Sequence, residues 1–143
     1  MDNNEENENE VKPIHENVRV LVVDDSEFAR KQITNIVENL GLTVAGEAST
    51  PSESIEAIAR TKANLIVVDV VMPEMNGIEL TKNLLEKFNN IYIIMVSSLC
   101  QENIILDSIA AGAMDFIQKP FEGDTLKTSL VKIAAIIEEE SNY

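Results

Sequence analysis

Residues 18–26, with the sequence VRVLVVDDS, decide the fold class of this chain. Six residues, four of them Val and one Leu, stand directly before two acids, Asp24 and Asp25. A short apolar run with little polar alternation is typical of a strand covered on both faces, as in a parallel sheet. The stretch therefore predicts a buried strand whose carboxyl end carries two charged groups.

This pattern recurs along the chain, where five short apolar runs alternate with stretches of helical spacing. In the first helical stretch, apolar residues recur at intervals of three or four from Ala29 to Leu40, and the stretch from Leu126 to Ile137 repeats the same spacing. Strands that alternate with helices through short connections form a parallel sheet with helices on both faces. We expect one such α/β domain, with strands at 18–23, 42–48, 64–68, 91–96 and 114–118.

Local signals mark the ends of the predicted helices. Thr50 is followed by Pro and, three residues later, by Glu, which predicts a helix N-terminus. Asn76 and Asp124 stand before two further helices and can cap them. Gly41 ends the first helix.

Composition excludes several classes of protein. The 143 residues carry 25 acids against 11 Lys and Arg, for a net charge of -14, which disfavours binding to nucleic acid or anionic membranes. One Cys excludes an internal disulfide and a Cys-based zinc site. No apolar run reaches the roughly 18 residues that span a bilayer. We expect a soluble cytoplasmic protein with no nucleic-acid or membrane partner.

The acidic residues are concentrated at the two ends. Residues 1–17 contain six acids and one Lys without an apolar period, so we interpret them as a disordered lead. Three consecutive Glu stand at 138–140. The predicted organisation is the lead at 1–17, the folded domain at 18–140 and a short tail at 141–143.

Polar residues follow the predicted strands at one edge of the sheet, where ligands of α/β proteins bind. Asp24 and Asp25 follow the first strand, Asp69 the third, Ser97 ends the fourth and Lys119 follows the fifth. Three gathered carboxylates repel one another, and a hard divalent cation such as Mg²⁺ relieves that repulsion. A Lys and a hydroxyl beside them suit a phosphoryl group. The residues predict a Mg²⁺-dependent phosphoryl site with an aspartate as acceptor.

These motifs resemble the receiver domain of the two-component response-regulator family, and within it the stand-alone proteins of the CheY type. The matching stretches are Leu21–Ser26, Val68–Pro73 with Gly77, Met95–Ser98 and Ala111–Phe121. The resemblance implies a flavodoxin-like (βα)5 fold, doubly wound, with a five-stranded parallel sheet in the order 2-1-3-4-5.

The resemblance also implies a role for each site residue. Asp69 is the phosphoacceptor, and Asp24, Asp25, Asp69 and the backbone carbonyl of Val71 bind Mg²⁺, Asp24 through water. Lys119 pairs with the phosphoryl oxygens. Ser97 and Phe116 form the switch, in which the aromatic ring turns inward when the hydroxyl moves toward the phosphoryl group. Val71 is apolar where several relatives are polar, and we expect it to hinder an attacking water.

By the same resemblance, the protein is a regulatory phosphoacceptor and not a true enzyme. A sensor histidine kinase supplies the phosphoryl group, and the surface of the fourth helix, fifth strand and fifth helix, at roughly 101–137, then binds a partner, such as a chemotaxis component or a flagellar motor switch. Two alternatives remain open: the receiver domain of a longer transcriptional regulator, and a haloacid-dehalogenase-like phosphatase. In the phosphatases a second Asp lies two residues after the nucleophile, whereas here Asp24 and Asp25 are adjacent.

Overall fold

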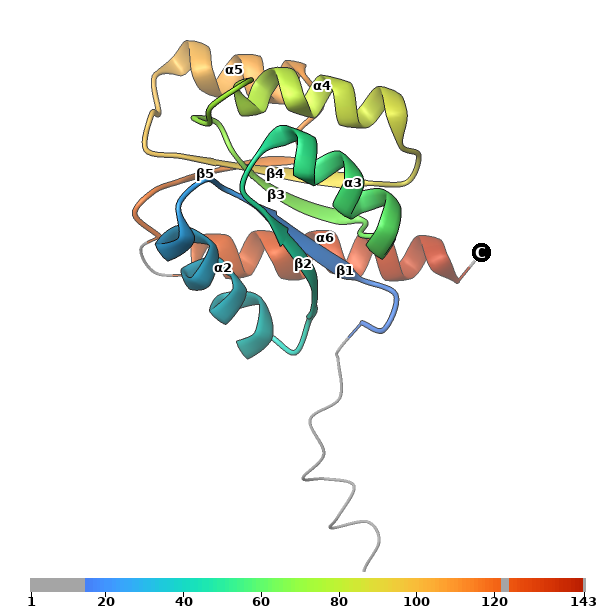
Figure 1. Ribbon diagram of the computed structural model, residues 1–143. Coiled ribbons are helices and arrows are strands. Elements are labelled where there is room, and N and C mark those ends of the chain that lie inside the picture. The colour runs from blue at the N-terminus through green and yellow to red at the C-terminus, as the bar shows by residue number, and fades with distance from the viewer. Residues whose placement is uncertain (1–14, 122–123, 143) are drawn as a thin grey trace, which may run out of the picture.

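Five parallel strands form the centre of the structure, a computed structural model that describes residues 15–121 and 124–142 (Figure 1). The described residues contain five strands and five helices in alternation. In chain order these are β1 (Arg19–Val23), α2 (Glu27–Asn39), β2 (Thr43–Ala48), α3 (Pro51–Thr61), β3 (Leu65–Asp69), α4 (Gly77–Lys87), β4 (Tyr92–Ser97), α5 (Glu102–Ala110), β5 (Asp115–Gln118) and α6 (Thr125–Ser141). The predicted alternation is confirmed, and the predicted fourth and fifth helices are α5 and α6.

The strands pair in the order β2-β1-β3-β4-β5, and every pair is parallel. This order confirms the flavodoxin-like topology expected from the resemblance. β1 and β3 lie at the centre, with Val23 opposite Val68 in register. The acids that follow these two strands are therefore neighbours at one edge of the sheet.

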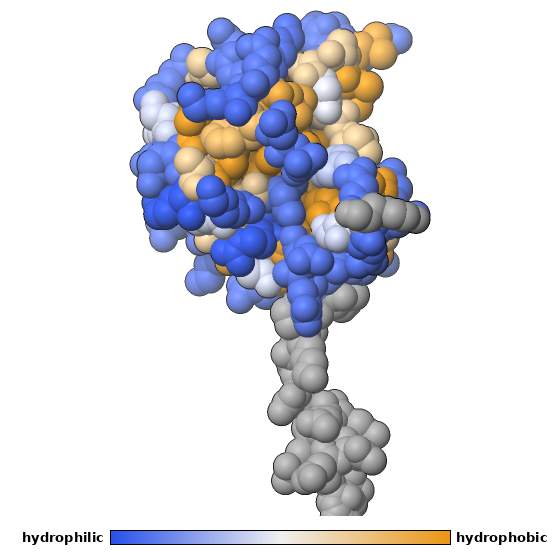
Figure 2. Space-filling view, turned by 90° about the vertical axis from the view of Figure 1, so that its right-hand side faces the viewer, coloured by the Kyte–Doolittle hydropathy of each residue, from blue (hydrophilic) through white to orange (hydrophobic). Residues whose placement is uncertain are grey.

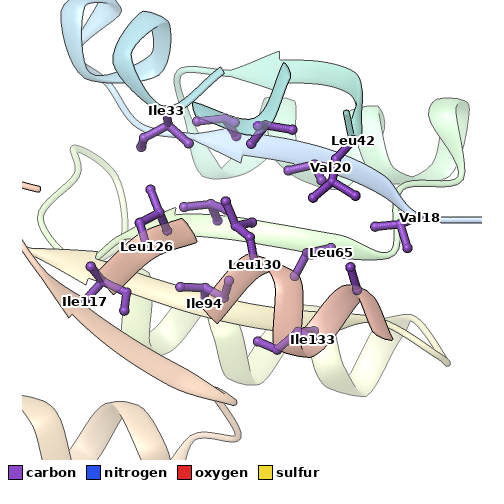
Figure 3. Packing of buried hydrophobic residues seen from close by; sticks show 14 of the residues in the cluster. Val18, Val20, Ile33, Leu42, Leu65, Ile94, Ile117, Leu126, Leu130 and Ile133 are labelled. Carbon is purple, nitrogen blue, oxygen red and sulfur yellow. The ribbon is translucent and has the colours of Figure 1, made fainter. Parts of the chain in front are cut away.

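Successive residues of the strands pack on opposite faces, which gives two hydrophobic layers. Val20 and Val22 lie in a layer covered by α2 and α6 (Figure 3). Leu21 and Val23 lie in the other layer, against α3, α4 and α5. Because both faces are buried, β1 is apolar throughout apart from Arg19 at its start, as the opening stretch of sequence predicted.

The helix ends follow the predicted signals in all but one case. Thr50 Oγ1 accepts from Glu53 N at 3.2 Å, and Asn76 Oδ1 accepts from Glu79 N at 2.9 Å. Gly41 follows α2 with φ 78°, the left-handed conformation that ends a helix. The prediction for Asp124 is wrong in its detail. Asp124 stands at the N-cap of α6, but its side chain makes no capping hydrogen bond; its carboxylate lies 3.9 Å from Lys127 Nζ.

The end of α6 is held against the amino-terminal edge of the sheet. Asn17 Nδ2 donates to Glu138 at 2.9 Å, and Asn64 Nδ2 donates to the Asn17 carbonyl at 2.7 Å. The Tyr92 hydroxyl donates to the Glu140 carboxylate at 2.5 Å. Two carboxylates of the acidic run at 138–140 therefore form hydrogen bonds to the rest of the domain, so this run does more than keep the end of the chain solvated.

These contacts change the predicted boundaries. Residues 1–14 of the predicted lead lie outside the described residues, whereas 15–17 form a turn in which the His15 carbonyl accepts from Val18 N. Ser141, predicted in the tail, is the last residue of α6.

Figure 2, which views the molecule from the right of Figure 1, shows mostly hydrophilic residues on that side, with hydrophobic residues exposed between them near the middle.

Candidate functional site

Asp24 and Asp25 lie where β1 passes into α2. Ser26 caps α2, so the strand ends and the chain turns at this point, which lets two adjacent carboxylates approach the same edge of the sheet. Asp24 is 1% exposed, and its Oδ1 accepts from Ser26 N at 2.9 Å. Asp25 is exposed to solvent. One carboxylate is thus fixed inside the site and the other stands at its mouth.

Asp69 is the last residue of β3 and is 7% exposed. Its carboxylate forms a group with those of Asp24 and Asp25, in which one oxygen atom from each residue lies within 4.8 Å of the other two. Burial and then the charge of Asp24 raise the pKa of Asp69 to about 6, although Lys119 acts in the opposite direction. Three acids from two neighbouring strands are brought together, as the sequence predicted.

Lys119 reaches this group from the segment after β5. Its Nζ lies 2.6 Å from Asp24 Oδ2 and 3.6 Å from Asp69 Oδ2. The Lys119 backbone N donates to the Ser97 carbonyl at 2.8 Å, which fixes the segment beside the end of β4, and the Lys119–Pro120 bond is cis. The ammonium is therefore placed to contact an anion bound at either acid.

Ser97 and Phe116, the two predicted switch residues, lie on the neighbouring strands β4 and β5. Ser97 is completely buried at the end of β4, and its Oγ accepts from Leu99 N at 2.9 Å. Within the described part of the chain, no hydrogen bond joins this hydroxyl to Asp69. Phe116 is half-buried on β5, packed against the layer that α3, α4 and α5 cover. The structure gathers the three acids and brings Lys119 into contact with two of them, Asp24 and Asp69, whereas no described hydrogen bond or ion pair joins the side chains of Ser97 or Phe116 to this group.

Val71 stands beside the predicted phosphoacceptor. Its backbone N lies 3.4 Å from Asp69 Oδ1, and its side chain is 52% exposed. An apolar side chain at this position offers a water molecule no hydrogen-bond partner next to the carboxylate.

Gly77, which the sequence singled out as part of the family motif but without a role in the site, packs directly on the acceptor. A Cβ at this position would lie 2.2 Å from the Asp69 carbonyl oxygen and 2.9 Å from the Val70 Cα. Gly77 N also donates to the Val70 carbonyl at 2.7 Å. The first turn of α4 thus packs on the backbone of the acceptor so closely that no side chain fits.

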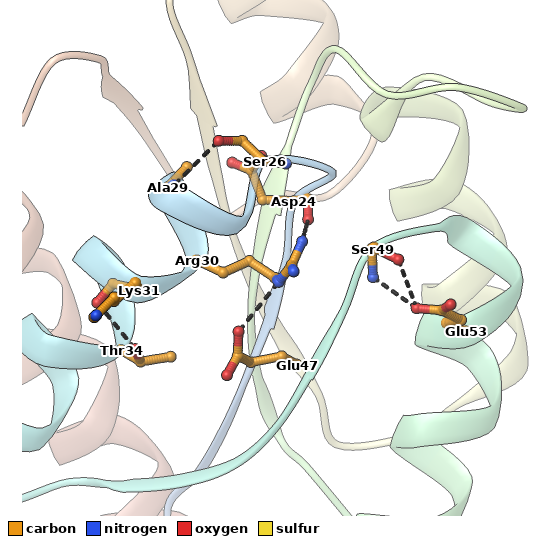
Figure 4. A network of polar contacts seen from close by, with 9 residues as sticks. All are labelled: Asp24, Ser26, Ala29, Arg30, Lys31, Thr34, Glu47, Ser49 and Glu53. Atoms are coloured by element: carbon orange, nitrogen blue, oxygen red, sulfur yellow. Dashed lines mark hydrogen bonds and ion pairs between the residues drawn. The ribbon is translucent and has the colours of Figure 1, made fainter.

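Arg30 is a second residue that the sequence did not reveal. Its Nη1 donates to the Asp24 carbonyl at 2.7 Å and its Nε to Glu47 Oε1 at 3.1 Å (Figure 4). A position one turn after Ser26 carries no signal of this contact, because a long side chain can turn to either side of its helix.

The donor set fits a hard divalent cation. All three candidate ligands are carboxylates, which Mg²⁺ prefers over the nitrogen and sulfur ligands of softer metals. Burial, and after it the charge of Asp24, raise the pKa of Asp69, and the nearby Lys119 does not offset these two effects. A divalent cation bound among the three carboxylates would offset these effects.

A groove with a volume of about 900 Å³ lies away from the acids, between β5 and α6. Phe116 and Gln118 of β5 line one side, and Thr128 and Lys132 of α6 line the other.

In the described residues, no helix is long and apolar enough to cross a membrane.

Comparison with known proteins places these features in a family. Residues 20–131 match the family described as response regulator receiver domain. The chain is 38% identical over 116 residues to the chemotaxis protein CheY of Thermotoga maritima, which covers 81% of this chain and 97% of that protein. It is 36% identical to the CheY of Bacillus subtilis, over 80% of this chain and 95% of that one.

Solved structures agree with the sequence matches. A chain of the CheX-CheY-BeF3-Mg²⁺ complex from Borrelia burgdorferi is 30% identical, with a TM-score of 0.76, over 81% of this chain and 88% of that chain. A CheY-like receiver domain protein from Methanospirillum hungatei is 27% identical, with a TM-score of 0.77, over 86% of this chain and 98% of that one.

Proposed function

Because this chain belongs to the response regulator receiver domain family, we propose that it is a phosphorylation-activated switch in which Asp69 accepts a phosphoryl group from a histidine kinase. The observation that carries the proposal is the contact of Lys119 with two of the three carboxylates whose nearest oxygen atoms, one from each, lie within 4.8 Å of one another. A cation-binding group and a fixed ammonium beside a buried carboxylate are the parts that phosphoryl transfer requires.

In the proposed transfer, an electron pair on a carboxylate oxygen of Asp69 forms a new bond to phosphorus while the bond from phosphorus to the donor histidine breaks. The bonding pair returns to the imidazole nitrogen, which takes up a proton from solvent. Asp69 must be ionised for this attack, and the Lys119 ammonium favours that ionised form. Lys119 then contacts the oxygens of the aspartyl phosphate.

Mg²⁺ is the cofactor that we propose for this site. Asp25 and Asp69 would each supply a carboxylate oxygen and Val71 its backbone carbonyl, while Asp24 would bind the ion through water. A bound Mg²⁺ would offset the charge of the acids and of the transferred group. Because burial and repulsion hold the pKa of Asp69 at about 6 without a cation, this compensation also favours the reactive carboxylate at neutral pH.

The proposed response travels from Ser97 to Phe116. Ser97 gives up its contact with Leu99 N and donates its hydroxyl to the new phosphoryl group. The half-buried Phe116 side chain then moves inward from β5, which alters the surface of α5, β5 and α6. The groove between β5 and α6 belongs to this surface, so we propose that it takes part in binding the downstream partner.

The relatives support a partner in chemotaxis, acting in the cytoplasm. Several are chemotaxis proteins named CheY, and the Borrelia burgdorferi chain was solved together with CheX. We therefore propose a chemotaxis component or a flagellar motor switch as the downstream protein, bound more tightly after phosphorylation. A few kcal/mol of preference for the phosphorylated conformation is enough to reverse its population.

The test of the proposed function is stoichiometric labelling of Asp69. The protein is incubated with Mg²⁺ and acetyl phosphate or phosphoramidate, and its intact mass is followed. We expect one phosphoryl adduct on the wild type, none on Asp69→Asn, and one on the control Asp107→Asn, which alters an exposed acid of α5. An adduct that persists in Asp69→Asn, or none on the wild type with either donor, refutes the proposal. Steady release of phosphate from an ester would indicate a phosphatase instead.

A further inference from the structure

Arg30 joins two elements beneath the acidic group. The side chain leaves the first turn of α2 and is only 16% exposed. Its Nη1 donates to the Asp24 carbonyl at 2.7 Å, and its Nε donates to Glu47 of β2 at 3.1 Å (Figure 4). Hydrogen bonds from a guanidinium are charge-assisted, and the planar fork fixes two acceptors at once.

The acceptor of the first bond belongs to the peptide unit that links Asp24 to Asp25. Asp24 N donates to the Ala48 carbonyl at 3.0 Å, so the residue is held to β2 on its amino side. On its carboxyl side β1 has ended, and the bond from Arg30 takes the place of a strand partner. The orientation of this one peptide plane therefore depends on Arg30.

The two carboxylates differ in how they are held. The carboxylate of Asp24 has partners of its own, Ser26 N at 2.9 Å and Lys119 Nζ at 2.6 Å. Within the described ranges, the carboxylate of Asp25 has no hydrogen bond or ion pair. Its position is set through the backbone, and thus through the peptide plane that Arg30 holds.

We propose that Arg30 is a positioning residue of the cation site, which fixes the peptide unit between Asp24 and Asp25 so that the Asp25 carboxylate faces Asp69. The proposal rests on the proposed function, since it takes the three acids to be Mg²⁺ ligands. Glu47 holds the guanidinium in turn, so that the chain of support runs from β2 through Arg30 to the end of β1.

Two physical roles for Arg30 predict opposite effects on Mg²⁺. If its charge alone mattered, its removal would tighten Mg²⁺ binding, because one positive charge fewer would repel the cation. If it positions Asp25, its removal weakens Mg²⁺ binding, as loss of the outer support of metal ligands generally does, by about 10-fold or more. The sign of the change separates the two roles.

The experiment measures Mg²⁺ affinity by isothermal titration calorimetry for the wild type, Arg30→Met and Arg30→Lys. The matched control is Arg60→Met, which breaks an exposed pair with Glu56 on α3. We expect a dissociation constant about 10-fold higher for Arg30→Met, an intermediate value for Arg30→Lys and no change for the control. Phosphoramidate labelling at saturating Mg²⁺ should recover toward the wild-type rate, because the acceptor itself is intact.

The outcomes separate this proposal from the proposed function. Unchanged or tighter Mg²⁺ binding by Arg30→Met overturns the positioning role even if the variant unfolds at lower temperature. If Arg30→Met does not fold, Arg30→Lys decides alone: weaker binding supports the role and wild-type binding overturns it. A wild type that binds no Mg²⁺ and takes no phosphoryl group refutes the proposed function itself.

Discussion

The ammonium of Lys119 forms its close ion pair, at 2.6 Å, with Asp24. Asp69, the proposed acceptor, is a further ångström from the same nitrogen. Asp24 is almost fully buried. Among the described residues, the only other group that contacts its carboxylate is the backbone N–H of Ser26. Before phosphorylation, Lys119 therefore serves the stability of the domain by neutralising a buried acid.

Lys119→Ala should lower the free energy of unfolding by about 3 kcal/mol without Mg²⁺, because it leaves Asp24 as a buried charge without its counterion. The control is Lys127→Ala, whose exposed pair with Asp124 spans 3.9 Å and should contribute little. Urea unfolding of both variants measures the difference. Equal stabilities would mean that water, and not Lys119, compensates Asp24.

The pKa of Asp69 predicts how stability depends on pH. Its folded-state pKa of about 6 lies above the ordinary 3.8. Between these two pH values, the folded protein therefore keeps a proton on Asp69 that the unfolded chain has released. The stabilising contribution is present below pH 4 and is lost as pH rises through 6. Without divalent cations, Asp69→Asn should therefore be more stable than the wild type at pH 8, by on the order of 2 kcal/mol. At pH 4 the two proteins should nearly agree.

Thermal unfolding in a chelating buffer at both pH values measures this difference. Parallel stability curves for wild type and variant across the range would contradict the raised pKa.

How far the sequence predicts the site depends on the kind of contact. Asp24, Asp69 and Lys119 follow strands, and the carboxyl ends of parallel strands meet at one edge, so their approach could be predicted from order along the chain. The sequence could not predict that Lys119 pairs more closely with Asp24 than with Asp69, because the two distances differ by only about one ångström.

Other contacts were hidden for related reasons. Arg30 donates to a backbone carbonyl, which no side-chain pattern records. Asn17 and Glu138 form a hydrogen bond although they are 121 residues apart in the sequence. Both belong to segments whose polar composition predicts a solvated chain. Fold and strand order were predictable because periodicity covers whole elements, whereas these contacts each depend on one side chain.

Gly77→Ala should destabilise the domain by about 1–3 kcal/mol, because its Cβ would lie 2.2 Å from the Asp69 carbonyl oxygen and must displace backbone. Gly46→Ala is the matched control, since its Cβ would meet only side-chain atoms at van der Waals distance, Leu21 Cδ1 at 3.4 Å and Thr61 Cγ2 at 3.7 Å. Urea unfolding gives the stabilities, and labelling by phosphoramidate gives the effect on the acceptor. A Gly77→Ala variant as stable and as readily labelled as Gly46→Ala would show that α4 can retreat without cost.

Val71→Asn should shorten the lifetime of the phosphorylated state several-fold. The apolar side chain stands beside Asp69 and gives an attacking water nothing to bind, whereas an amide can hold and direct it. The decay of the phosphoryl adduct after removal of the donor is followed by intact mass. Val131→Asn, at a similarly exposed position on α6, should decay like the wild type. A Val71→Asn adduct as long-lived as the wild type would show that this side chain does not control water.

Tyr92 should titrate at unusually high pH. Its hydrogen bond to Glu140 raises the pKa of the phenol to about 12. In a Tyr143→Phe background, absorbance at high pH reports Tyr92 alone, and Glu140→Gln should move its titration back toward 10. Because the folded pKa is the higher one, this contact stabilises the fold at neutral pH and is lost only above pH 10. Identical titration curves with and without Glu140→Gln would exclude the bond.

The contacts of Asn17 with Asn64 and Glu138 fix where the chain enters the domain: at the opposite end of β3 from Asp69. A fluorophore, affinity tag or surface anchor attached at His15 itself therefore joins the domain on the side away from the acidic group. Phosphodonors, whether a kinase or a small molecule, can then reach the acidic group of an immobilised sample without competition from the attachment.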